Sequence, residues 1–309
     1  MTVIYGISGL ILLYYGAEFL VKGGSSIALK MKISPLVIGL TLIAYATSAP
    51  ELVVSIDASL KGFGDVSIGN IVGSNICNIA LILGLCAAIT PLQVNEKLLK
   101  FDVWLMIGSA AALLVCYMLN SGVNRIEAGI LLCGCLSYTL WSICSSRKDN
   151  STAGDVPRTQ YNIFIAILMV AGGLTALIGG AKLFVNASIT IAKWCNVSDA
   201  VIGLTVVAVG TSLPELATSV VAAIRKEQDI AIGNVIGSNI FNVLAIMGIT
   251  PLIAPVKALN ISYVDMILMV VLSIMLYPVM KTGMKISRKE GIGLLAVYIA
   301  YTLYLIIKK

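Results

Sequence analysis

The chain has 309 residues, of which 59% are hydrophobic and only 12% charged, with a formal net charge of +6. A soluble domain of this size is typically about half apolar and about a quarter charged, so these proportions exclude an ordinary soluble enzyme or binding domain. Long apolar runs recur along the chain, which indicates an all-α polytopic membrane protein; they do not alternate as the strands of a β-barrel would. The bases are spread over short loops, so no nucleic-acid partner is expected.

The apolar runs predict about ten transmembrane helices. The first run is interpreted as a retained helix and not as a removed signal peptide, because no basic region precedes it and no clear cleavage site follows it. One clearly polar stretch, residues 146–160, is interpreted as a linker between a first repeat, residues 1–145, and a second, residues 161–309. The predicted helices lie at 3–21, 35–60, 66–90, 102–119 and 126–144, then at 161–186, 198–224, 230–254, 263–280 and 291–307.

Two motifs occur twice at a constant offset of 164 residues. Ala-Thr-Ser-Ala-Pro-Glu at 46–51 matches Gly-Thr-Ser-Leu-Pro-Glu at 210–215, and a Gly-Asn-x-x-Gly-Ser-Asn-Ile-x-Asn segment at 69–78 matches one at 233–242. Each half holds five predicted helices, an odd number, so similar halves must cross the membrane in opposite senses. The sequence therefore predicts two inverted five-helix repeats, with a site near the membrane midplane where they meet.

The distribution of loop bases predicts the orientation in the cell membrane. Loops after odd-numbered helices hold 14 of the 21 bases, and loops after even-numbered helices together with the C-terminal tail hold 7, if Lys182 is counted with its nearest loop. Both termini are therefore expected outside, and the linker in the cytoplasm.

Two acids, Glu51 and Glu215, fall at the predicted depth of the bilayer, where a carboxylate costs at least about 2.5–3.5 kcal/mol. No base lies near either in sequence, and two carboxylates balance one divalent cation. Pro50 and Pro214 precede them, and a proline breaks the helical hydrogen bonding and frees carbonyls about one turn earlier. The expected carbonyls are those near Ala46 and Gly210, with Ala44 and Ala208 on the same turns.

Hydroxyl and amide side chains complete an oxygen-only set, which suits a hard cation such as calcium, a metal that takes about six to eight oxygen ligands. The chain has no histidine and seven cysteines; we interpret the cysteines as buried apolar residues, and nothing in the motifs favours zinc or copper. The contributing side chains are Thr47, Ser48, Ser74 and Asn78 in the first repeat and Thr211, Ser212, Ser238 and Asn242 in the second.

On these doubled motifs the chain resembles the sodium/calcium exchangers of the cation/calcium antiporter superfamily, in particular the short prokaryotic members. The resemblance implies that Glu51, Glu215, Thr47 and Thr211 bind calcium. It implies that both glutamates also serve sodium, together with the carbonyls of Ala44 and Ala208 and the side chains of Ser48, Ser74, Asn78, Ser212, Ser238 and Asn242. It further implies that the first and sixth helices are the moving pair.

Three positions depart from the family pattern or divide its members. Ala46 replaces the usual glycine and Ala49 the usual leucine, and because alanine tolerates non-helical backbone less well than glycine, the geometry of the first break is the open question. Asn242 stands where other members carry aspartate, which by resemblance implies transport without potassium.

The expected function is a secondary antiporter, not an enzyme, that exchanges sodium for calcium electrogenically by alternating access. No cofactor is expected, since calcium and sodium are the transported ions, and the lipid bilayer is the only other partner; the sequence gives no oligomeric state. A calcium/proton exchanger, an intramembrane hydrolase and a channel are the alternatives. Asp57 is interpreted as a solvated helix end near Lys61, and Glu18 and its repeat mate Lys182 are given no transport role.

Overall fold

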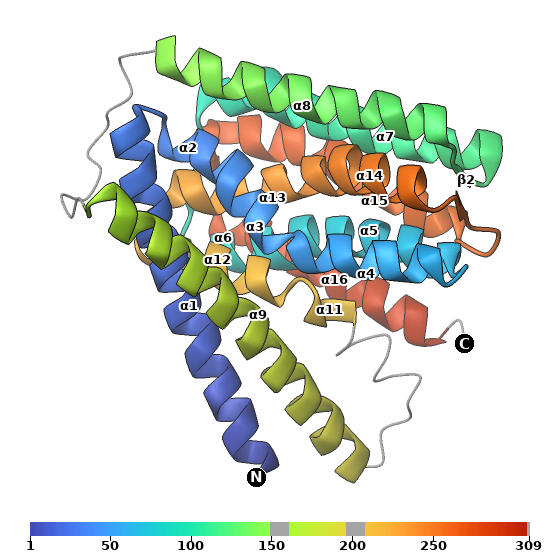
Figure 1. The fold of residues 1–309 in the computed structure, drawn as a ribbon, viewed down its shortest axis with the longest axis horizontal. Coiled ribbons are helices and arrows are strands. Elements are labelled where there is room, and N and C mark those ends of the chain that lie inside the picture. Colours follow the sequence, from blue (N-terminus) through green and yellow to red (C-terminus); the bar gives the residue numbers. More distant parts are fainter. Residues whose placement is uncertain (149–160, 196–207, 308–309) are drawn as a thin grey trace.

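The computed structural model describes residues 1–148, 161–195 and 208–307 (Figure 1). Its first half contains five helical stretches, three of which combine α-helix with wider π-helical turns. They are α1 (Thr2–Met31); α2 (Pro35–Ile38), η1 (Gly39–Ile43), α3 (Ala44–Thr47) and α4 (Ala49–Leu60); α5 (Gly64–Ile76), η2 (Cys77–Leu83) and α6 (Gly84–Ile89); η3 (Leu98–Asp102) and α7 (Val103–Asn120); and α8 (Arg125–Lys148).

The second half repeats this order. It consists of α9 (Ile163–Trp194); α11 (Ala208–Gly210) and α12 (Leu213–Ile224); α13 (Gln228–Phe241), η5 (Asn242–Ile246) and α14 (Met247–Ile253); α15 (Tyr263–Lys281) with a short η6 (Thr282–Met284); and α16 (Arg288–Ile307). Within the described ranges, eight helices are long and apolar enough to span a membrane, and the pair Pro35–Thr47 and Ala49–Leu60, bent by 44°, makes a ninth. The remaining predicted helix, 198–224, falls partly on residues 196–207, outside the described residues.

The predicted all-α polytopic fold is confirmed, although several ends were placed too early. α1 continues ten residues past the predicted end at 21, and α9 continues eight past 186. α8 ends at Lys148, so the first three residues of the predicted linker are helical, and residues 149–160 lie outside the described part. Extra turns of this kind extend an apolar helix beyond the bilayer core, where the apolar pattern that located it no longer applies.

Two short antiparallel ladders identify the two ends of the molecule. β1 (Leu92–Gln93) pairs with β4 (Lys285–Ile286), and β2 (Gly122–Val123) pairs with β3 (Val256–Lys257). An offset of 164 relates β1 to β3 and one of 163 relates β2 to β4, so one ladder is the repeat image of the other. Each ladder therefore joins a loop of one repeat to a loop of the other, as an inverted repeat requires.

α1 and α9 lie side by side and extend beyond the other helices at one end (Figure 1). Their backbones approach closely at glycines: a Cβ on Gly16 would lie 2.8 Å from the Gly173 carbonyl, and one on Gly9 would lie 2.8 Å from the Gly180 carbonyl. These pairs run in opposite directions along the two helices, so the packing is antiparallel. The same offset maps Gly9 onto Gly173 and Gly16 onto Gly180. Small residues of this kind permit close helix contact in a membrane, where the hydrophobic effect does not drive association.

α13 occupies the middle of the remaining bundle (Figure 1), and all its residues from Ile230 to Phe241 are buried. It packs against the first part of the second helix, where a Cβ on Gly237 would lie 2.5 Å from the Leu40 carbonyl and one on Gly233 would lie 2.7 Å from that of Leu36. These glycines bring the motif of the second repeat against the broken helix of the first.

Candidate ion-binding site

Each half has a helix break at the serine that precedes its Pro-Glu pair. Ser48 has φ −83° and ψ 7°, and Ser212 has φ −86° and ψ 7°, so the two breaks have nearly the same backbone geometry. A proline stands in the first turn of the following helix, α4 or α12, where its missing N–H costs nothing. Ala46 lies within helical α3, before the break. The alanine therefore leaves the first break unaltered.

The two glutamates lie in the first turns of α4 and α12 and bond across the repeat interface. Ser48 Oγ donates to Glu215 Oε1 at 2.8 Å, and Ser212 Oγ donates to Glu51 Oε1 at 3.1 Å. Glu51 is 0% and Glu215 1% exposed. Because each serine belongs to the repeat opposite its acceptor, these bonds bring both carboxylates into one buried site, as the motifs predict.

The second oxygen of each carboxylate, Oε2, is buried without a hydrogen-bond partner among the described residues. Other orphaned polar atoms lie on the neighbouring motif residues: both amide atoms of Asn78, the hydroxyl of Ser238 and Oδ1 of Asn242. Buried polar atoms are normally bonded, and an unpaired one is costly. A concentration of oxygens of this kind is what a dehydrated hard cation coordinates.

Wide helical turns begin at the two asparagines of the motifs. π-helical η2 starts directly before Asn78, and η5 starts at Asn242. The two positions differ by 164, so the distortion belongs to the repeat and not to one helix. Single π-turns often occur at functional sites. Asn242 also donates from Nδ2 to Asn75 Oδ1 at 3.0 Å, which fixes the orientation of its amide.

The remaining predicted ligands differ from one another in burial and in hydrogen bonding. Ser74 is 3% exposed, and its Oγ lies 3.2 Å from Ser212 Oγ. The Ala44 carbonyl accepts from the Ser48 N–H at 3.0 Å, so in this structure it is already bonded, and it lies 3.2 Å from Thr47 Oγ1. Thr211 is half-buried and lines a cavity, and Ala208 begins α11.

Asn70 and Asn234 were not identified as functional from the sequence, yet they hold the two breaks in place. Asn70 Nδ2 donates to the Glu51 carbonyl at 3.2 Å and to Ser55 Oγ at 3.1 Å. Asn234 Nδ2 donates to the Glu215 carbonyl at 3.4 Å and to Ser219 Oγ at 2.9 Å. Both asparagines lie inside the repeated segment, so the offset of 164 was the signal that could have found them.

The two helix breaks differ in the contact that Thr47 makes with the other repeat. Its hydroxyl donates to Asn234 Oδ1 at 3.2 Å, so Asn234 fixes a predicted calcium ligand of the first repeat as well as the backbone of the second. Asp57, in contrast, has the solvated position expected for it: its side chain is 59% exposed and pairs with Lys61 at 2.7 Å.

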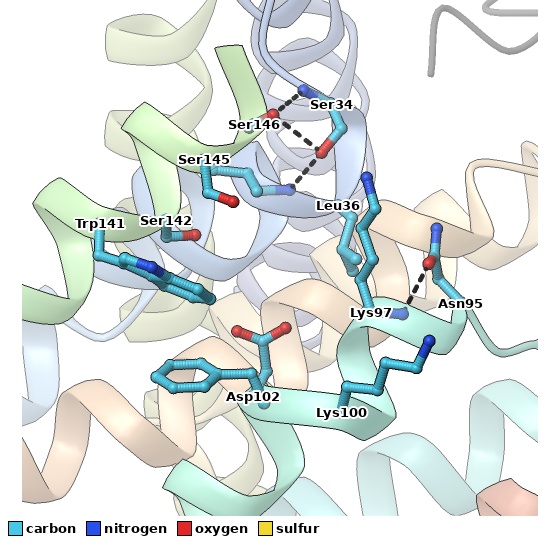
Figure 2. Close-up of a pocket in the computed structure, with 12 residues that line it drawn as sticks. Ser34, Leu36, Asn95, Lys97, Lys100, Asp102, Trp141, Ser142, Ser145 and Ser146 are labelled. Atoms are coloured by element: carbon cyan, nitrogen blue, oxygen red, sulfur yellow. Dashed lines mark hydrogen bonds between the residues drawn. The ribbon is translucent and has the colours of Figure 1, made fainter. Parts of the chain in front are cut away.

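Two cavities have different relations to the site. One of about 230 Å³ lies between α9 and the two breaks, and its lining includes Lys182, Thr211 and the prolines that directly precede the two glutamates, Pro50 and Pro214. Another, of about 390 Å³, lies between the start of α2, η3 and the end of α8, where Lys97 and Asp102 line it opposite Ser146 (Figure 2). None of the predicted ion ligands lines this second cavity, so it is separate from the ion site.

Comparison with known proteins agrees with this geometry. The family model described as "Sodium/calcium exchanger protein" matches residues 1–144 and 165–307. The chain is 36% identical to the putative antiporter CaxA of Alkalimonas amylolytica, with 97% of each chain covered, and 34% identical to the sodium/calcium exchanger MaX1 of Methanosarcina acetivorans, with 96% of each covered. A solved structure of the sodium-calcium exchanger NCX_Mj superposes with a TM-score of 0.84 at 36% identity, covering 98% of both chains. The chain therefore belongs to the sodium/calcium exchanger family of membrane antiporters.

Proposed function

We propose that this protein exchanges sodium ions for calcium across the cell membrane by alternating access. The observation that carries the proposal is the pair of buried glutamates, each bonded to a serine of the other repeat and each with one oxygen that has no partner among residues 1–148, 161–195 and 208–307. Two carboxylates with neighbouring hydroxyl and amide oxygens match the charge and the ligand preference of one calcium ion. Glu51, Glu215, Thr47 and Thr211 are the proposed calcium ligands.

The same cluster supplies separate places for sodium once calcium has left. Ser238 is fully buried, and its hydroxyl has no partner in the part of the chain that the structure describes; Ser48, Ser74 and Ser212 bond directly to the carboxylates or to each other. The proposed sodium ligands are these four serines, Asn78, Asn242, both glutamates and the carbonyls of Ala44 and Ala208. Three or more sodium ions per calcium move net positive charge inward, and each charge gains about 2.3 kcal/mol across 100 mV.

Potassium independence is proposed from the chemistry of Asn242. This residue is a neutral amide whose Nδ2 donates to Asn75 Oδ1, so it adds no third negative charge to the two glutamates. An extra cation in the transported set would lack a charge to balance it.

The decisive experiment is calcium uptake into proteoliposomes loaded with sodium and diluted into sodium-free buffer at fixed pH. We expect uptake that requires the sodium gradient, that responds to an imposed membrane potential and that is unchanged when potassium is omitted. Empty liposomes diluted in the same way provide the background.

Two results would contradict the proposal. Uptake that follows a pH gradient and ignores sodium would identify calcium/proton exchange, and uptake that needs no counter-ion gradient would identify a channel. The sodium arm and the pH arm are measured in the same preparation, so a loss of protein activity cannot be mistaken for either outcome.

A further inference from the structure

One ion pair joins the α1–α9 pair to the helix that carries Glu215. Glu18 of α1 accepts from Arg225 Nη2 at 2.5 Å and from Lys22 Nζ at 2.7 Å, and its side chain is only 10% exposed. Arg225 caps the C-terminal end of α12, directly after Ile224. These side chains line a cavity of about 220 Å³ with Val221 and Glu227. Sliding or rocking of α1 along α12 must break the contact between Glu18 and Arg225.

The repeat images of these residues carry different charges. The offset of 164 maps Glu18 onto Lys182, Arg225 onto Lys61, and Val221 onto Asp57. The direct image of the Glu18–Arg225 pair is therefore Lys182 and Lys61, two bases, and the acid available to Lys182 is Asp57, one helical turn before Lys61. In this structure Lys182 lines the cavity beside Pro50 and Val54, while Asp57 pairs with Lys61 at 2.7 Å.

The inverted repeat predicts how the helices are arranged in the opposite access state. Because the halves are related by a two-fold axis in the membrane plane, exchanging their conformations produces a state that opens to the other side. In that state α9 meets α4 as α1 meets α12 here. Lys182 then occupies the place that Glu18 occupies now, with Lys61 in the place of Arg225 and Asp57 in the place of Val221, which lines the same cavity as Glu18. Of these two residues only Asp57 carries the charge that can pair with Lys182.

We propose that Glu18–Arg225 and Lys182–Asp57 are alternately formed ion pairs, each closed in one access state and open in the other. This inference rests on the alternating-access exchange proposed above. Each pair stabilises only the state in which it is formed, so removing it shifts the balance toward the other state. The two ion pairs therefore stabilise opposite access states of the transport cycle.

The test is the sidedness of calcium binding in proteoliposomes of uniform orientation, measured as the half-saturating calcium concentration on each face. Glu18→Gln should raise this value on one face and lower it on the other, changing their ratio by about five- to tenfold. Lys182→Gln should change the ratio in the opposite direction. The exchanged pair Glu18→Arg with Arg225→Glu should restore the wild-type ratio.

Glu96→Gln is the matched control, because Glu96 pairs with Lys100 at 3.1 Å within one turn and joins no moving element to another. In this variant the ratio of the half-saturating calcium concentrations on the two faces should stay at the wild-type value. Shifts in the same direction for Glu18→Gln and Lys182→Gln, or no shift in either while both still exchange, would overturn the proposal.

Hydrogen–deuterium exchange provides a readout that does not depend on flux. Glu18→Gln should increase amide exchange at the C-terminal end of α12, and Lys182→Gln should decrease it there, because the second variant favours the state in which the Glu18 contact is closed. Absence of sodium-driven flux in the wild-type protein would contradict the proposed function, whereas equal exchange in all variants would contradict the ion pairs alone.

Discussion

At the scale of single residues, each of the two glutamates uses one carboxylate oxygen to bond the other repeat and leaves the second available for a cation. One oxygen of each accepts a serine hydroxyl from the other repeat, and the second has no partner among the described residues. The serine bonds hold each carboxylate in place, so the second oxygen of each is available before a cation arrives. Preorganisation of this kind lowers the entropic cost of binding.

Glu51→Gln and Glu215→Gln should each abolish calcium exchange. Each variant keeps the size of the side chain and one acceptor for the serine, but removes one of the two charges that balance calcium. Breaking a buried charge pair costs about 3–5 kcal/mol, which is ~100-fold or more in affinity. Calcium flux and binding calorimetry measure the loss, and size-exclusion profiles check the fold. Normal exchange in either variant would show that the glutamates are not the calcium ligands.

Asn234 should matter more for calcium than its repeat mate Asn70. Both amides hold a glutamate carbonyl, but Asn234 also accepts the Thr47 hydroxyl at 3.2 Å. Asn234→Ala therefore removes one more hydrogen bond than Asn70→Ala, worth about 1 kcal/mol or roughly fivefold in calcium affinity. Calcium titrations of the two variants and of Thr47→Val measure the difference. Equal affinities in Asn234→Ala and Asn70→Ala would show that Thr47 is not positioned by this contact.

At the scale of elements, the sequence predicted the type of each helix but not the way each departs from regularity. Apolar runs located the spans, and the prolines located both breaks within two residues. The π-helical turns at Asn78 and Asn242 were not predicted, because no residue type marks a wide turn as proline marks a break. The extra length of α1 and α9 was also missed, since it lies where polar residues such as Lys22 interrupt the apolar pattern.

The antiparallel packing of α1 on α9 gives a prediction that compares two adjacent glycines. A Cβ on Gly173 would lie 2.7 Å from the Gly16 carbonyl, whereas one on Gly172 would meet nothing within 4 Å among the described residues. Gly173→Ala should therefore force the helices apart and destabilise the protein by about 1–3 kcal/mol. Gly172→Ala should be neutral or stabilising by up to about 1 kcal/mol, because alanine favours the helix.

Thermal unfolding midpoints of both glycine variants in detergent measure this difference directly. A lower midpoint for Gly173→Ala than for Gly172→Ala supports the close approach of the two backbones. Equal midpoints would mean that α1 and α9 do not pack at the glycines.

At the scale of the whole molecule, the constant offset between the motifs predicted an architecture that composition alone could not. It placed the halves in opposite senses, and the two ladders confirm this by joining β1 to β4 at one end and β2 to β3 at the other. What the offset could not supply is the contact between repeats, such as the bond from Thr47 to Asn234. Those contacts depend on how a helix face of one repeat packs against a different helix face of the other. The sequence pattern within one repeat does not specify that packing.

The orientation predicted from the loop charges, with the linker in the cytoplasm, can be tested on two native cysteines. Lys22 and Lys182 lie inside α1 and α9 and not in loops. The prediction counted Lys22 with the loops on the linker side and Lys182 with those on the other side. Leaving both out therefore keeps the excess of bases on the linker side. Cys144 near the end of α8 lies on that side and Cys195 after α9 on the other, and both are exposed.

A membrane-impermeant maleimide applied to intact cells should therefore modify Cys195, and it should modify Cys144 only after the membrane is permeabilised. Peptide mass spectrometry distinguishes the two sites, and Cys195→Ser and Cys144→Ser confirm the assignments. Modification of Cys144 in intact cells with Cys195 protected would reverse the orientation. It would place the base-rich loops outside, against the electrostatic preference that retains lysine and arginine on the cytoplasmic face.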